Sequence, residues 1–216
     1  MNNEQSRFNM IEQQIRPWNV LDTSVLALLA VVRREDFVPA TCRALAFMDT
    51  ELPLPDGQAM LAPRVEARLL QDLQVQRHER VLEIGTGSGF TAALLGHRAQ
   101  EVVSLEIRPE LAALATENLR RSGAGNVTVI EADGAAGWPA EAPFDAILLS
   151  GSVSKVPAAL LEQLKPGGRL VAVEGEDPMM VAVRYTRAAD GFQREELFDT
   201  VIARLDGFPE PSRFHF

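Results

Sequence analysis

The sequence is poor in cysteine and has no basic cluster, and each shortage disfavours a class of protein. Cys42 is the only cysteine among 216 residues, so no disulfide can form within the chain, which agrees with a reducing compartment. The chain carries 21 lysines and arginines against 30 aspartates and glutamates, a formal net charge of −9. This balance disfavours non-specific binding to nucleic acid or to an anionic membrane surface.

Long apolar runs and grouped histidines are lacking as well. The longest early apolar run, residues 25–32, is too short to cross a bilayer and has neither the basic start nor the cleavage site of a signal peptide. The histidines at 78, 97 and 215 are scattered, without the spacing of metal ligands. We therefore expect a cytoplasmic protein with no metal, no membrane partner and no nucleic-acid partner. The oligomeric state stays open.

What the chain does have is a glycine-rich turn between an apolar strand and a helix. Residues 81–90 read Val-Leu-Glu-Ile-Gly-Thr-Gly-Ser-Gly-Phe. Glycine at such a turn permits positive φ and lets a ligand lie against bare backbone, while the start of the helix offers unpaired N–H groups. A dinucleotide fingerprint, G-x-G-x-x-G, would place its last glycine at Phe90, so the spacing argues against a dehydrogenase.

Two acids accompany this turn. Glu83 lies inside the strand before it, and Glu106 ends the next apolar run, residues 102–105. A carboxylate at the tip of the second strand can accept hydrogen bonds from both hydroxyls of a ribose. The pattern E-x-G-x-G-x-G with this second acid resembles class I S-adenosylmethionine-dependent methyltransferases. A purely structural glycine turn is the less favoured alternative.

The rest of the chain alternates apolar strand patterns with helical ones. Predicted strands lie at 80–84, 102–106, 127–130, 144–149 and 169–173, predicted helices at 1–20, 22–34, 63–73, from 89, from 109 and at 156–164, and a closing hairpin at 179–188 and 192–203. This order predicts one α/β domain with a Rossmann-like, mostly parallel seven-stranded sheet, helices on both faces and a C-terminal antiparallel hairpin. We divide it into N-terminal helices and a substrate loop (1–63), a cofactor-binding core (64–175) and a hairpin with a tail (176–216).

Four stretches together resemble one family. Residues 46–63, a long proline-interrupted loop, are similar to the signature loop of protein-L-isoaspartate O-methyltransferases, as are residues 81–90, 126–138 and 142–170. The similarity runs in unbroken order over roughly residues 8–175. It implies transfer of the methyl group of S-adenosyl-L-methionine to the α-carboxylate of an isoaspartyl residue in a damaged peptide or protein, a repair reaction.

The resemblance also implies cofactor contacts. They fall on Glu83, Gly85, Thr86, Gly87, Ser88, Gly89, Glu106, Ile107, Asp133 and Gly134. Glu83 and the glycine turn would hold the methionine end, Glu106 the ribose, and Asp133 with Gly134 the adenine. On the residues alone, Asp133 fits an Asp-Gly turn equally well.

The loop departs from the family pattern at the reacting centre. The family reads Gly-Gln-Thr-Ile-Ser-x-Pro there, whereas this chain reads Gly-Gln-Ala-Met-Leu-Ala-Pro from residue 57, so Leu61 replaces the serine. Leucine cannot hydrogen-bond a carboxylate, so no catalytic residue is assigned. We expect the substrate pocket to include Asp49, Gln58, Met60, Leu61, Ser150 and Ser152. The two serines either replace the lost hydroxyl or only cap the following turn, and Asp49 is expected to order the loop.

Three hypotheses on function follow. The preferred one is O-methylation of isoaspartyl carboxylates, since a carboxylate is ionised at neutral pH and needs no general base. The second keeps the methyltransferase class but takes a less charged acceptor, because Ala59 and Leu61 make the loop apolar. The third is a non-catalytic module that binds the cofactor.

Overall fold

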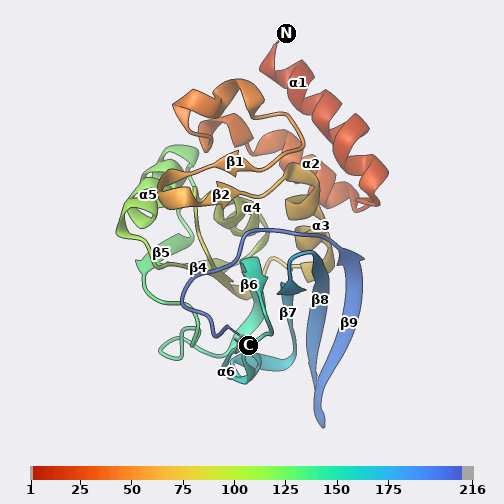
Figure 1. The fold of residues 1–216 in the computed structure, drawn as a ribbon, viewed down its shortest axis with the longest axis vertical. Coiled ribbons are helices and arrows are strands. Elements are labelled where there is room, and N and C mark those ends of the chain that lie inside the picture. Colours follow the sequence, from red (N-terminus) through yellow and green to blue (C-terminus); the bar gives the residue numbers. More distant parts are fainter. Residues whose placement is uncertain (1, 211–216) are drawn as a thin grey trace, which may run out of the picture.

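The computed structural model describes residues 2–210, so the predicted aromatic tail at 214–216 lies outside the described residues. A seven-stranded sheet in the order β5-β4-β3-β6-β7-β8-β9 forms the centre of the molecule (Figure 1). Its strands are β3 (Arg80–Ile84), β4 (Glu101–Glu106), β5 (Val127–Glu131), β6 (Phe144–Val153), β7 (Leu164–Glu176), β8 (Met179–Ala188) and β9 (Gly191–Asp199). The first five are parallel to one another, and β8 and β9 form an antiparallel hairpin beside them, which confirms the predicted sheet.

Helices and a short second hairpin complete the fold. They are α1 (Asn3–Met10), α2 (Thr23–Val31), α3 (Pro63–Leu73), α4 (Phe90–Arg98), α5 (Pro109–Ser122) and α6 (Ala158–Leu161), with β1 (Leu52–Pro53) pairing with β2 (Ala59–Met60). Val81 and Leu148 share a core with apolar side chains of α2 to α5, whereas Leu82 and Leu149 belong to a second core with α6. The side chains alternate because successive residues of a strand point to opposite faces.

Local capping signals explain several boundaries. The Asp22 carboxylate accepts the Ser24 N–H at 2.8 Å and caps α2, and Pro63 occupies the first position of α3. Gly123 ends α5 in the left-handed conformation at φ 78°. These three positions agree with the sequence patterns, because each signal acts within a few residues of the boundary that it sets.

Tertiary pairing overrides the prediction for residues 156–168. The predicted helix 156–164 shortens to α6, since Phe144 of β6 pairs with Leu164 and draws the chain into β7 early. Residues 165–168, between that predicted helix and the predicted strand at 169–173, therefore belong to β7, where the register with β6 shifts.

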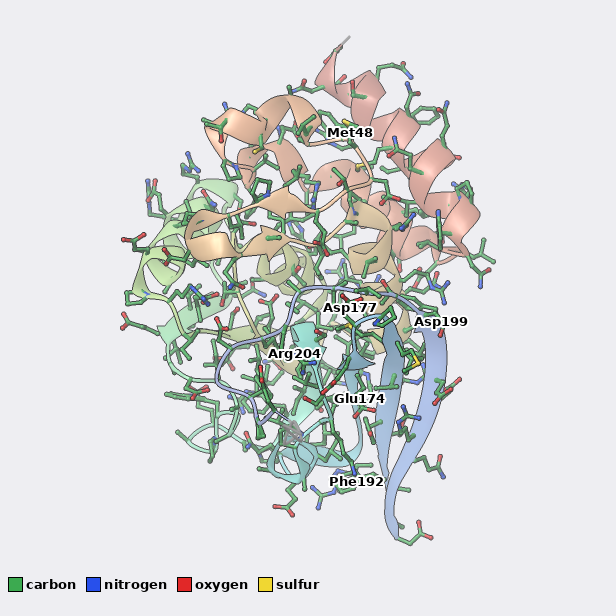
Figure 2. All side chains as sticks on the ribbon, viewed as in Figure 1. Met48, Glu174, Asp177, Phe192, Asp199 and Arg204 are labelled. Atoms are coloured by element: carbon green, nitrogen blue, oxygen red, sulfur yellow. The ribbon has the colours of Figure 1, made fainter. Side chains whose placement is uncertain are left out.

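The second strand of the predicted closing hairpin also ends early, at Asp199. The chain then crosses the carboxyl edge of the parallel strands, on a path that Figure 2 marks with Asp199 and Arg204. The Ser152 N–H donates to the Ala203 carbonyl at 2.8 Å, and the Leu205 N–H donates to the Ser152 carbonyl at 2.9 Å. We call residues 200–209 the crossing segment.

The N-terminal elements and the β1–β2 hairpin lie above the carboxyl ends of β6 and β7 in the view of Figure 1. In residues 2–210 no helix has the length and apolar character that a bilayer span needs.

Candidate active site

A cavity opens where β3, β4 and β6 end, the edge at which open α/β sheets bind their ligands. Its empty volume, including the open mouth, is about 500 Å³. The walls come from the glycine turn, the end of β4, Ser150 of β6, the β1–β2 hairpin and the crossing segment; they include Leu54, Gln58, Gly85, Gly87, Glu106, Ile107, Arg108, Ala132, Gly134, Ser150, Leu205 and Asp206. We call it the rim cavity.

The glycine turn presents backbone to this cavity. Gly85, Gly87 and Gly89 have φ values of 93°, 55° and 85°, and the Gly85 N–H donates to the Leu105 carbonyl at 2.9 Å. A Cβ on Gly134 would lie 2.3 Å from the Ile84 side chain, so a side chain there would push into the neighbouring strand. The turn and Gly134 together form a side-chain-free cradle of the kind that a nucleoside ligand needs.

Glu106 lies at the bottom of the rim cavity. One carboxylate oxygen accepts the Gly87 N–H at 2.9 Å and the other accepts the Arg108 N–H at 3.0 Å. Each oxygen of a carboxylate can accept more than one hydrogen bond, so both keep capacity for a ligand hydroxyl. The residues present therefore fit the ribose of the predicted cofactor.

Glu83 lies behind the wall of the cavity and does not line it. It is fully buried and accepts the Ser104 hydroxyl at 2.6 Å and the Ser150 hydroxyl at 2.8 Å. Burial raises the pKa of Glu83 to about 8, and the hydrogen bonds from the two serines only partly oppose that rise. Its predicted direct contact with the cofactor stays a prediction, and in this structure Glu83 reaches the cavity through Ser150.

A second cavity, whose empty volume including its open mouth is about 280 Å³, adjoins the rim cavity across the glycine turn. The two share Leu54, Ala59, Gly85, Gly87 and Ser150, and the second adds Met60, Leu61, Glu66, Thr86, Ser88, Phe90 and Thr91. Glu66 is the one ionisable residue among the residues that line it. We call it the acceptor pocket, and its loop side is apolar, as Leu61 and Met60 led us to expect.

The two serines at the end of β6 differ in position. Ser150 lines both cavities. Ser152 is fully buried and its hydroxyl donates to the Ile202 carbonyl at 3.0 Å, so the structure places it away from both cavities. The predicted role of Ser152 in the substrate pocket stays a prediction, and in this structure the crossing segment covers the residue.

Two predicted acids order the backbone. The Asp49 carboxylate accepts the Arg64 N–H at 3.1 Å and pairs with its guanidinium at 3.1 Å, as expected for a residue that fixes the loop. The exposed Asp133 carboxylate accepts the Ala135 N–H at 2.9 Å, which is the turn alternative. The neighbours of Asp133, Ala132 and Gly134, line the rim cavity instead.

The sequence patterns missed Arg108, Leu205 and Asp206. Arg108 pairs with Asp206 of the crossing segment and lies 3.9 Å from Asp56 beside the β1–β2 hairpin. A Cβ on Gly85 would meet the Leu205 side chain at 2.6 Å, so the crossing segment packs directly on the turn. No local signal marks these residues, since they come together only through the tertiary path of residues 200–209.

Comparison with known proteins tests the expected family. The family model described as protein-L-isoaspartate(D-aspartate) O-methyltransferase matches residues 5–202. The chain belongs to this family. It is an S-adenosylmethionine-dependent methyltransferase, and the expectations of family, fold class and cofactor are confirmed.

Relatives cover most of the chain. A protein-L-isoaspartate O-methyltransferase of Myxococcus xanthus (strain DK1622) is 49% identical over 88% of this chain and 92% of its own length. Protein-L-isoaspartate O-methyltransferase 2 of Anaeromyxobacter sp. (strain Fw109-5) is 43% identical over 90% of this chain and 80% of its own length. A Plasmodium falciparum protein assigned to the same family, solved with S-adenosyl-L-homocysteine, shares the fold at a TM-score of 0.79 and 22% identity, over 95% of this chain and 99% of that chain.

We predict that Glu106→Gln weakens binding of S-adenosyl-L-homocysteine about tenfold or more, because hydrogen bonds to a charged acceptor contribute about 1.5–3 kcal/mol. Isothermal titration calorimetry gives the dissociation constant. Glu101→Gln, at the opposite end of the same strand, is the matched control and should bind as the wild type does. Equal affinity for the Glu106 variant would contradict a ribose contact at this carboxylate.

We predict that Glu83 makes stability depend on pH. Its pKa rises from 4.5 to about 8 in the folded protein, so between these values the folded state holds a proton that the unfolded state releases. The free energy of unfolding of the wild type should therefore fall, relative to Glu83→Gln, as the pH rises from about 5 to 8. Urea denaturation of both proteins across this range is the measurement, and a constant difference between them would refute the assignment.

Proposed function

We propose that the protein transfers the methyl group of S-adenosyl-L-methionine to the α-carboxylate of L-isoaspartyl residues in peptides or proteins. One observation carries this proposal: the rim cavity and the acceptor pocket share the backbone of Gly85 and Gly87. A nucleoside held along the turn would therefore place its reactive end at the entrance to the acceptor pocket. Family membership supports the choice of acceptor.

The protein residues need only align the reactants and exclude water. The bound cofactor supplies a methyl group already activated by its sulfonium charge. Glu106 and the turn orient the nucleoside, while Leu54, Met60 and Leu61 exclude water from the acceptor pocket. An acceptor carboxylate is ionised at neutral pH, so alignment, and not proton removal, is the task of the site.

Ser150 is the proposed substitute for the family's loop serine. It lines both cavities, and Glu83 fixes its hydroxyl at 2.8 Å. With a pKa of about 8, Glu83 is mostly protonated at neutral pH, so its O–H can donate to Ser150 instead of accepting from it. That arrangement frees the hydrogen of the Ser150 hydroxyl for an acceptor carboxylate.

A second candidate keeps the same chemistry and changes the acceptor. The loop side of the pocket carries Leu54, Met60 and Leu61, and none of the described residues that line the pocket is a cation. Apolar walls favour a less charged nucleophile, since an ionised group without partners is costly to bury.

One label-transfer experiment separates the two candidates. With methyl-labelled S-adenosylmethionine and an isoaspartyl peptide, we expect the wild type to form a base-labile methyl ester, and the matching aspartyl peptide to stay unlabelled. Absence of label in the presence of cofactor binding would reject this acceptor. Isoaspartyl activity that appears only in Leu61→Ser would favour the second candidate.

We further predict that Ser150→Ala lowers kcat/KM for the isoaspartyl peptide about 10- to 100-fold. The reason is the loss of a hydrogen bond to a charged group, which contributes about 1.5–3 kcal/mol. Ser152→Ala is the matched control, because its hydroxyl points to the Ile202 carbonyl and should leave kcat/KM within about twofold. Steady-state kinetics at saturating cofactor tests this, and equal losses in both variants would reject the role of Ser150.

A further inference from the structure

A buried ion pair lies beneath the acceptor loop. Arg34, in the short 3₁₀ helix after α2, and Glu66, on α3, are 1% and 3% exposed, and their side chains meet at 3.0 Å. A buried pair of this kind contributes little net stability compared with apolar residues, so its presence calls for another reason.

Arg34 contacts the acceptor loop and the helix after the glycine turn at once. One terminal nitrogen donates to the Leu61 carbonyl at 2.9 Å, and the other donates to Glu66. The guanidinium carbon lies 5.1 Å from the ring centroid of Phe90, the first residue of α4. The Thr91 hydroxyl, one residue further along α4, donates to the free oxygen of Glu66 at 2.5 Å.

We propose that Arg34 is a positioning residue that couples the cofactor turn to the acceptor loop. Gly89 ends the turn and Phe90 begins α4, so a ligand that fixes the turn also fixes the two residues on which the ion pair rests. Arg34 also donates to the Leu61 carbonyl, so fixing these two residues fixes the position of Leu61 as well. Leu61 is one of the residues that line the acceptor pocket. Binding of the cofactor thereby prepares the pocket for its acceptor.

The planar fork of arginine is essential to this role. It spans Leu61 and Glu66 with two separate nitrogens, whereas lysine keeps the charge but has a single nitrogen on a flexible stem. Arg34→Lys therefore cuts the link without leaving Glu66 opposite an uncharged residue.

The chain offers a matched control. Arg7 and Glu35 form another buried ion pair, at 2.5 Å, between α1 and the same 3₁₀ helix. This pair contacts neither the rim cavity nor the acceptor pocket. Arg7 meets residues 46–63 at the Phe47 ring, 6.0 Å from its guanidinium carbon, so Arg7→Lys reports the loss of a buried arginine beside the loop with the bond to the Leu61 carbonyl kept.

The test is amide hydrogen exchange of residues 46–63 with and without saturating S-adenosyl-L-homocysteine. We expect the ligand to slow exchange of these amides about fivefold or more in the wild type and in Arg7→Lys, and by less than twofold in Arg34→Lys. Full protection in Arg34→Lys, or no protection in a wild type that binds the ligand, would overturn the proposal.

Thr91 provides a second route should Arg34→Lys fail to fold. Thr91→Val removes the hydroxyl that ties α4 to Glu66, so protection of the loop should drop, and Thr91→Ser should restore it. Unchanged protection in Thr91→Val would count against the coupling.

The inference rests on the proposed function only for its kinetic readout. Arg34→Lys should raise KM for the isoaspartyl peptide about tenfold and leave the dissociation constant of S-adenosyl-L-homocysteine within about twofold. If the wild type binds this ligand but methylates no isoaspartyl peptide, the proposed function is refuted. The coupling proposal is then still decided by the exchange measurement, which needs no acceptor.

Discussion

The site depends on the register of three neighbouring parallel strands. Ile84 of β3 pairs with Leu105 of β4 on one side and with Leu149 of β6 on the other. The next residues along the three strands are Gly85, Glu106 and Ser150, so hydrogen bonding within the sheet places them at one edge. Because a shift by one residue would turn each side chain to the other face, this register is what brings turn, acid and hydroxyl together.

Three buried glutamates surround the two cavities, and their partners distinguish them. Glu106 accepts two backbone N–H groups, Glu66 faces the Arg34 guanidinium, and Glu83 faces only serine hydroxyls. Burial raises the pKa of both Glu66 and Glu83, and at Glu66 the cation opposes the rise. Glu83 has no such cation, and its pKa of about 8 keeps it mostly protonated near neutral pH.

The sequence predicts well what is decided locally. Helix α3 at 63–73 and strand β3 at 80–84 have the bounds that the apolar patterns indicate, and Glu106 ends β4 and lines the rim cavity. The patterns fail where distant segments decide. Strand pairing shortens α6, and the crossing segment covers Ser152.

On the proposed assignment, the hydroxyl that meets the acceptor has moved from the loop to the sheet. A serine at position 61 would extend from the loop, whereas Ser150 extends from β6 and is fixed by Glu83. The loop then needs only to exclude water and to hold its shape. Apolar Met60 and Leu61 suit the first need, and the bond from Arg34 to the Leu61 carbonyl suits the second. Since a backbone carbonyl accepts this bond, the chain can change the side chain at position 61 without losing the support beneath it.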